Sequence, residues 1–266
     1  MTKASNSKLE SIFQERKLIK LIIPISNEVL EKLTETEKSV VNYINSNADK
    51  LPSMSIVDVA EETFTSPATV SRTIKKCGLD GFTELRYILS KKDILNKDSK
   101  QVNAILGKSL MEATYTLEQI SVSKILQVVE LIKNSDRIYI LARGLTELVA
   151  AEFSLKLQLM GFNAFKISDP NIMIEISKGL KEDELIVIFS LNGKTPELIT
   201  SAKNAFELSC NVISCCSSSN TELKEFSHIF LNGYKHSHVS IKKFEVTSRL
   251  PLYIISRVII DYLAIS

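Results

Sequence analysis

Residues 56–82 read IVDVAEETFTSPATVSRTIKKCGLDGF, and this stretch decides the fold of the N-terminal part of the chain. The apolar residues Ile56, Val59 and Ala60 fall at helical spacing, which predicts a short helix with one buried face. Residues 63–66 lack that periodicity and indicate a turn. The stretch therefore predicts two short helices joined by a turn, as in a helix-turn-helix.

The second helix of this pair has the composition of a DNA-binding helix. The Ser66 hydroxyl can cap its first turn, Pro67 suits the first helical position, and Gly78 can end it in the left-handed conformation. Hydroxyls near its start and cations further along suit base edges and phosphates. The candidate DNA-binding residues are Ser66, Ala68, Thr69, Ser71, Arg72, Lys75 and Lys76. The alternative is an ordinary helical hairpin with a basic solvated face.

Length and charge limit the possibilities further. With 266 residues the chain is expected to hold two domains. The formal net charge is only +2, and residues 1–95 hold 14 Lys and Arg against 13 Asp and Glu. Any attraction to nucleic acid is therefore local to the second helix of the pair.

The four cysteines, at positions 77, 210, 215 and 216, do not form a metal-type pair or a disulfide framework. Reduced, packed thiols in a cytosol are expected. The N-terminus lacks the pattern of a signal peptide. The apolar tail 250–266 is interrupted by Arg257 and Asp261, so no membrane partner is expected.

The N-terminal half is expected to be helical. Residues 9–23 suggest an amphipathic helix, Thr34 and Glu37 have the spacing of a capping box, and further helices are expected at 84–89 and 102–133. Residues 91–101 are charged and polar, and either a hinge or a rigid strut fits them. The expected domains are 1–90 (helix-turn-helix), 91–108 (linker) and 109–266 (C-terminal domain).

From residue 137 onward the pattern changes to alternating strands and helices. Strands are expected at 138–142, 163–167, 185–189, 211–215 and 228–231, with helices at 145–160, 171–177, 196–208 and 246–264. Such alternation predicts an α/β fold with a doubly wound parallel sheet. The whole chain is thus expected to be an α-helical domain followed by an α/β domain.

Two loops that follow strands have the chemistry of an anion site. Residues 142–146 and 190–195 supply glycines, hydroxyls and helix N-termini, which can surround a phosphate. The candidate ligand-binding residues are Gly144, Thr146, Ser190, Asn192, Gly193 and Thr195. Plain strand-to-helix turns are an equal alternative from composition alone. Arg143 could reach an anion or lie on the surface, and the serine-rich loop 216–221 could line the crevice or be solvated.

The motifs resemble those of a known family. Residues 33–37, 56–60, the run Ser66-Pro-Ala-Thr-Val-Ser-Arg72 and the run Gly78-Leu-Asp-Gly-Phe82 resemble the N-terminal domain of RpiR-type bacterial transcriptional regulators. Residues 137–231 resemble the sugar-isomerase (SIS) domain of such regulators. The resemblance implies a cytoplasmic regulator of sugar-catabolic genes, a homodimer or higher homo-oligomer, that binds a double-stranded DNA operator and senses a phosphorylated sugar.

The sequence departs from the family pattern at several positions. Ala142 stands where glycine is frequent, Thr146 and Asn192 where serine is usual, and His228 where aspartate is common. These departures point to an unusual sugar phosphate or amino-sugar phosphate, or to weak binding.

The alternative function is a sugar-phosphate isomerase, because SIS domains also occur in enzymes. Isomerisation needs a general base, and the candidates are Glu147, Glu197, Glu245 and His228. Each is more simply explained as a surface or helix-cap residue, so no catalytic residue is expected. The pair His236 and His238 is too small a ligand set for a metal site, and no cofactor is expected.

Overall fold

The computed structural model describes residues 29, 31–90, 97–236, 239–241 and 244–266. The chain forms two compact units, residues 1–108 and 109–266. The helix expected over 9–23, part of the charged segment 91–101 and His238 lie outside the described residues. Within the described residues, no helix combines the length and apolar character that a bilayer span requires.

The first unit is built from short helices around one apolar core. They are α3 (Glu35–Ser46), the 3-10 turn η2 (Leu51–Ser53), α4 (Ile56–Glu62), α5 (Pro67–Lys76) and α6 (Phe82–Ser90). Val59 and Ala60 of α4 and Val70 and Ile74 of α5 are buried in this core, as the apolar spacing predicts. The stretch 56–82 is therefore a helix-turn-helix, which confirms the expected fold of this part.

Side-chain caps define where these helices begin. Thr34 and Glu37 form the expected capping box, and Ser66 accepts a hydrogen bond from Thr69 N at 3.1 Å. A second capping box, between Ser55 and Asp58, was not anticipated from the sequence. These caps satisfy N–H groups that a helix leaves unpaired at its start.

The helix expected over 102–133 is in fact two helices, α7 (Lys97–Gln119) and α8 (Val122–Lys133). The helical conformation is interrupted at Ser121, whose backbone is extended (φ −84°, ψ 121°). Its hydroxyl lies 2.9 Å from that of Ser123. Hydroxyl side chains compete with helical hydrogen bonding, which explains why apolar periodicity alone did not reveal the break.

The second unit contains the expected parallel sheet. Its strands are β1 (Arg137–Ala142), β2 (Ala164–Ile167), β3 (Glu184–Ser190), β4 (Asn211–Cys216) and β5 (Ile229–Asn232), in the order β2-β1-β3-β4-β5. All neighbouring strands pair in parallel, with Ile138 opposite both Ala164 and Leu185. This arrangement confirms the doubly wound α/β prediction, and the observed strands differ from the expected ranges by a residue or so at their ends.

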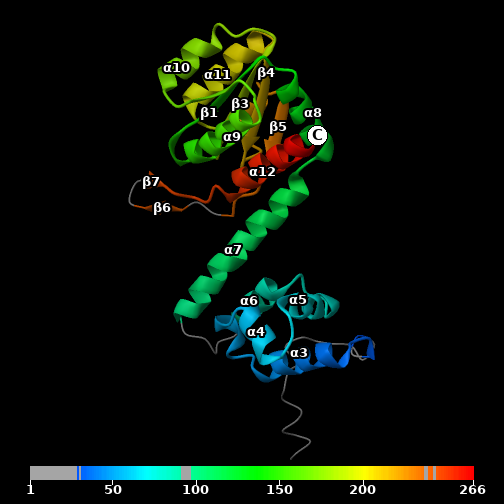
Figure 1. The fold of residues 1–266 in the computed structure, drawn as a ribbon. Coiled ribbons are helices and arrows are strands. Elements are labelled where there is room, and N and C mark those ends of the chain that lie inside the picture. Colours follow the sequence, from blue (N-terminus) through cyan, green and yellow to red (C-terminus); the bar gives the residue numbers. More distant parts are fainter. Residues whose placement is uncertain (1–28, 30, 91–96, 237–238, 242–243) are drawn as a thin grey trace, which may run out of the picture. The chain divides into compact units, whose positions relative to one another are not determined.

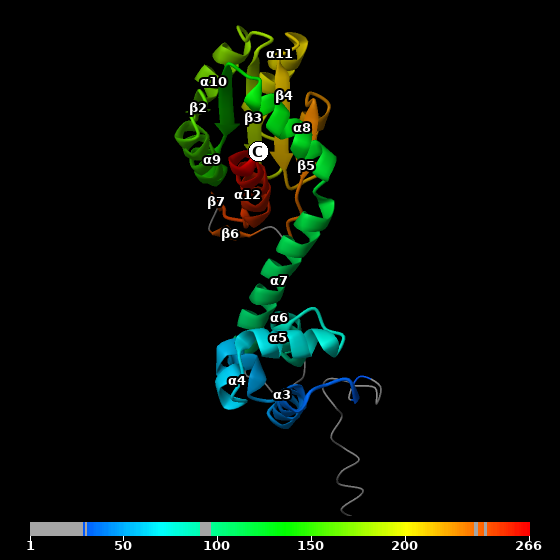
Figure 2. The ribbon, with the colours of Figure 1, turned by 45° about the vertical axis from the view of Figure 1, so that its right-hand side comes forward.

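Helices cover both faces of the sheet. α8, α9 (Glu147–Leu159) and α12 (Leu250–Ile265) lie on one face, and α10 (Pro170–Ser177) and α11 (Pro196–Glu207) on the other (Figures 1 and 2). Alternate residues of β3 enter the two cores, with Val187 in the first and Ile186 and Ile188 in the second. Each residue of β3 is thus buried, as a strand between two helical layers requires.

The C-terminal helix begins later than the sequence analysis placed it. α12 begins at Leu250 rather than at Val246, with Pro251 in its first turn. The residues before it form a short antiparallel pair, β6 (Ser240–Ile241) with β7 (Phe244–Glu245), which was not expected. The helix expected from Leu145 also begins later than expected, because residues Gly144–Thr146 form a 3-10 turn, η3.

The packing of the apolar layer between α9 and the sheet predicts a large loss of stability when its largest side chain is truncated. Phe153 is fully buried and packs edge-to-face on Phe189, with ring centroids 5.2 Å apart. Phe153→Ala is expected to lower the free energy of unfolding by about 3–5 kcal/mol, because the cavity would refill only in part. Urea unfolding of the full chain would measure this. Lys156→Ala, which removes a partly exposed side chain paired with Glu152 on the same helix, should cost less than about 1 kcal/mol, and equal costs would contradict the packing described.

Candidate functional sites

The first candidate site is the outward face of α5. Ser66, Ala68, Arg72, Lys75 and Lys76 are exposed there, while Thr69 and Ser71 are partly buried. Residues 70, 73 and 74 turn inward and are buried. Six of the seven candidate DNA-binding residues thus lie on α5 and the seventh, Ser66, is its N-cap; their role in DNA binding stays a prediction.

One of these cations has an additional structural partner. Lys76 Nζ lies 2.6 Å from Glu37 Oε1, and Glu37 is only 8% exposed. The hydrogen bond from Lys76, with one from the Thr34 backbone, holds the pKa of Glu37 below its usual value. Lys76 therefore links α5 to α3, whereas the Arg72 side chain bonds within its own helix, to Ala68 O at 3.2 Å.

The second candidate site is a cavity of about 200 Å³ at the carboxyl ends of β1 and β3. The chain leaves β1 toward β2 on one side, while β3 and β4 continue on the other, so this is the switch point of the sheet. Crevices at such points are where open α/β sheets hold ligands. The lining residues are Arg143, Thr146, Phe189, Ser190, Leu191, Asn192, Lys194, Thr195, Leu198, Glu245 and Arg249.

The loop after β3 is held in shape by its own glycine and by a neighbouring loop. Gly193 has φ +66°, and its amide donates to Ser190 Oγ at 3.0 Å. The Thr221 hydroxyl donates to Gly193 O, and Thr221 atoms lie 2.3–2.9 Å from where a Cβ at position 193 would be. The loop 216–221 therefore packs against the candidate phosphate loop, and only glycine fits at its tightest point.

Helix α11 adds the partial positive charge of its N-terminus. It begins at Pro196 directly after this loop, and the Thr195 side chain makes no capping hydrogen bond to it. A helix N-terminus with its side-chain cap unused favours an anion nearby.

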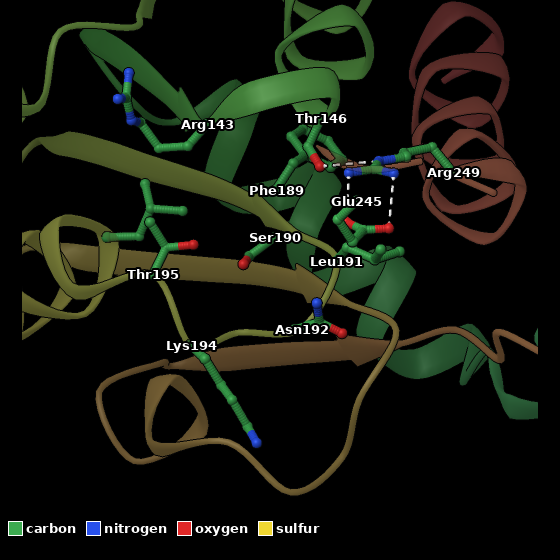
Figure 3. Close-up of a pocket in the computed structure, with 11 residues that line it drawn as sticks. Arg143, Thr146, Phe189, Ser190, Leu191, Asn192, Lys194, Thr195, Glu245 and Arg249 are labelled. Carbon is green, nitrogen blue, oxygen red and sulfur yellow. Dashed lines mark hydrogen bonds and ion pairs between the residues drawn. The ribbon is translucent and has the colours of Figure 1, made fainter. Parts of the chain in front are cut away.

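An arginine whose side chain is 11% exposed, Arg249, forms the wall opposite this loop. Arg249 makes two bonds to Glu245, at 2.8 and 3.2 Å, and its Nε lies 3.4 Å from Thr146 Oγ1 (Figure 3). Burial acts to raise the pKa of Glu245, but hydrogen bonds from Thr247 and the charge of Arg249 outweigh it and lower that pKa. Glu245 is therefore held as an anion bound to Arg249.

A further cation approaches the same loop from the segment after β5. Lys235 Nζ donates to Asn192 Oδ1. Burial lowers the pKa of Lys235, and so does the positive charge of Lys194 and Arg249, while Glu245 acts in the opposite direction. Arg143, Lys194 and Arg249 thus line a cavity that also offers hydroxyl groups, with Lys235 bonded to its loop, and this is the chemistry that binds an oxyanion.

The candidate general bases are either paired with a cation or far from the cavity. Glu197 lies 2.8 Å from Arg143 Nε, and Glu147 lies 3.5 Å from Lys166 Nζ. His228 precedes β5, at the amino end of the sheet, where its Nδ1 accepts from Val212 N. Among the residues that the structure describes, no group of three or more potential metal ligands is present.

Four of the six candidate ligand-binding residues line this cavity. Thr146, Ser190, Asn192 and Thr195 line it, whereas Gly144 and Gly193 do not. Arg143, left open between ligand contact and surface, lines the cavity and bonds Ser168 O at 2.6 Å. Their roles in binding stay predictions.

Arg249 was missed because the sequence analysis placed it inside the last helix. Pro251 is the signal that could have found it, since proline favours the first turn of a helix. That rule places Arg249 at the helix start, where the structure has it.

The two parts of the chain match two family models. Residues 15–96 match the helix-turn-helix domain of the rpiR family, and residues 131–255 match the SIS domain. Together the matches span most of the chain, so the protein is a helix-turn-helix transcriptional regulator whose C-terminal domain is of the sugar-phosphate-binding SIS type. The chain belongs to the RpiR family, which confirms the resemblance inferred from the sequence.

Individual relatives agree with this assignment. An uncharacterized HTH-type transcriptional regulator of Clostridium perfringens is 27% identical over 235 residues, covering 83% of this chain and 84% of the relative. The structure of the Vibrio vulnificus NanR protein complexed with ManNAc-6P has a TM-score of 0.56 at 20% identity and covers 88% of each chain. Phosphoheptose isomerase GmhA from Neisseria gonorrhoeae has a TM-score of 0.54 at 16% identity, over 64% of this chain and 100% of that enzyme. The two structures establish similarity of fold.

The crowding at Gly193 predicts a difference between two glycines of the cavity region. Gly144 (φ +59°) and Gly193 (φ +66°) are both left-handed, but only Gly193 has atoms within 4 Å of an added Cβ. Gly144→Ala should cost about 1–2 kcal/mol for backbone strain alone, and Gly193→Ala should cost more because it also collides with Thr221. Urea unfolding of both variants tests this, and equal losses of stability would refute the tight contact.

Proposed function

We propose that this regulator binds its operator through the exposed face of α5 and is controlled by a phosphorylated sugar held in the cavity between β1 and β3. The observation that carries the ligand assignment is the cavity itself: Arg143, Lys194 and Arg249 line it with hydroxyl groups at the start of α11. A phosphate there would meet charge-assisted hydrogen bonds and a helix N-terminus.

The volume of the cavity and the negative charge of its carboxylate limit the range of ligands that can bind. Its volume of about 200 Å³ is below the roughly 300–1,000 Å³ of pockets for drug-sized molecules. Glu245 supplies a carboxylate that can accept from a sugar hydroxyl or an amino group while it stays bound to Arg249. NanR, complexed with ManNAc-6P, makes that amino-sugar phosphate the first compound to test.

We propose that the chain is not an enzyme. Glu147, Glu197 and Glu245 are each paired with a cation that occupies their oxygen atoms, and His228 is at the wrong end of the sheet. A general base must reach the proton it removes. An isomerase assay on the same sugar phosphates tests this, and turnover that persists in a chain lacking residues 1–95 would favour the enzyme.

The remaining assignments belong to the same proposal. Residues 1–90 would be the DNA-binding domain, 91–108 the linker and 109–266 the effector domain. The regulator would work in the cytoplasm as a homodimer or higher homo-oligomer, because two helix-turn-helix units can read half-sites about 34–36 Å apart, or multiples of that distance. The effector would act by binding one DNA-binding state more tightly than the other.

Removing single cations from α5 should reveal phosphate contacts. Arg72→Ala and Lys75→Ala are each expected to weaken operator binding and to lower the salt slope of the association constant by about one unit. Fluorescence anisotropy with DNA from upstream of the gene, over a range of salt concentrations, measures this. Lys203→Ala removes the same charge from the other unit and should leave the slope unchanged. An unaltered slope in both α5 variants would place the DNA-binding face elsewhere.

Removing two hydroxyls from the cavity should separate effector binding from DNA binding. Ser190→Ala combined with Thr195→Ala is expected to abolish binding of N-acetylmannosamine 6-phosphate, or of whichever phosphosugar raises the melting temperature in a screen. DNA affinity without the sugar should be retained. Calorimetry provides the measurement, and Thr200→Ala on the exposed side of α11 is the control. Normal sugar binding by the double variant would refute the assignment of the site.

A further inference from the structure

The segment that follows β5, Gly233–His236, lies between the cavity and helix α7, and we call it the strap. Tyr234 N donates to Thr116 Oγ1 at 3.0 Å, and His236 N donates to Glu112 Oε1 at 3.0 Å. The rings of Tyr115 and Tyr234 pack edge-to-face with centroids 5.0 Å apart. Two successive turns of α7 therefore bind the backbone of the strap.

Gly233, the first residue of the strap, is packed so closely against its neighbours that it cannot shift past them. A Cβ at Gly233 would lie 2.8 Å from Pro251 Cβ and 3.3 Å from Thr116 Cγ2. Gly233 N also donates to Cys216 O at 2.7 Å. The strap is thus wedged between α7 and the first turn of α12, the turn that follows Arg249.

Lys235 is the strap residue that contacts the cavity loop. Its neighbours Tyr234 and His236 bond to α7, whereas Lys235 Nζ donates to Asn192 Oδ1. Lys235 shares its surroundings with the cations Lys194 and Arg249. An anion in the cavity would attract the three cations Lys235, Lys194 and Arg249. Its binding would therefore change the electrostatic force on Lys235, and through Lys235 on the strap.

The side chains of α7 that hold the strap are buried polar groups. Thr116 is fully buried and Glu112 is 5% exposed, so a strap that moved without α7 would leave them without partners at a cost. α7 is one helix from Lys97 to Gln119. Its earlier turns belong to the first unit, where Asn103 Nδ2 donates to Pro52 O at 3.0 Å and Gly107 abuts the Tyr87 ring.

We propose that the strap couples occupancy of the cavity to helix α7, with Lys235 as the residue that contacts the bound anion and Glu112 and Thr116 as the positioning residues that receive the change. The inference rests on the proposed function, since it assigns the route by which the effector reaches the helix shared with the DNA-binding unit. α7 is suited to this because it continues as one helix from the turns that hold the strap back to Lys97.

Hydrogen exchange of the full chain, with inorganic phosphate or N-acetylmannosamine 6-phosphate as the probe, tests the coupling without knowledge of the operator. In the wild type, the probe should slow exchange both in the loop 190–195 and in α7 over 109–119. In Glu112→Ala with Thr116→Val, protection of the loop should persist and the response of α7 should be lost. The matched control is Glu112→Gln with Thr116→Ser, which keeps both acceptors and should keep the response.

Calorimetry and DNA binding complete the test. The Ala/Val variant should bind the probe within about threefold of wild type, while the factor by which the probe changes DNA affinity, roughly 5–150-fold for a coupled regulator, falls toward one. Lys235→Met should lower probe affinity by about tenfold or more, and Lys235→Arg should retain most of it.

Three results would overturn the inference. An α7 response that survives in the Ala/Val variant would show that the strap is not the route. Probe affinity unchanged in Lys235→Met would remove Lys235 from the anion site. If the wild-type loop 190–195 gained no protection from either probe, the cavity would not be the effector site, and the proposed function would fail together with the coupling.

Discussion

The pairing of β1 with β3 is the constraint on which the candidate effector site depends. Because these strands are parallel neighbours and the chain reverses its direction of winding between them, their carboxyl ends open a crevice that helices cannot fill. The loops that leave both strands must border this crevice. One loop contributes Arg143 and Thr146 and the other Ser190 to Thr195, so side chains some fifty residues apart in the chain share one cavity.

Three cations in or beside the cavity are each held in place by a partner. Arg249 is held by Glu245, Arg143 by Glu197, and Lys235 by the Asn192 side chain. Paired in this way, the cations stay at fixed positions at little reorganisation cost, which favours anion binding. The same pairing occupies Glu197 and Glu245, two of the carboxylates considered as general bases.

Much of the fold was predictable from local patterns. The helix-turn-helix follows from apolar spacing around a Ser-Pro start, and the strands follow from short apolar runs that alternate with helices. The errors arose where a polar residue outweighed the apolar period. Ser121 divides the helix expected over 102–133, and residues 246–249, expected in the last helix, precede its start at Leu250.

The sequence by itself determined which residues could cap, turn and bind anions, because these depend on a few neighbours along the chain. Thr146, Ser190, Asn192 and Thr195 could therefore be named before their positions were known. Only the tertiary structure decided that Arg249 contacts Thr146 after β1 and that Lys235 contacts Asn192 after β3. The ion pair of Lys76 with Glu37 was likewise decided by the tertiary structure. Such contacts depend on how strands and helices pack in space. The residues are far apart in the chain, so no local sequence pattern predicts them.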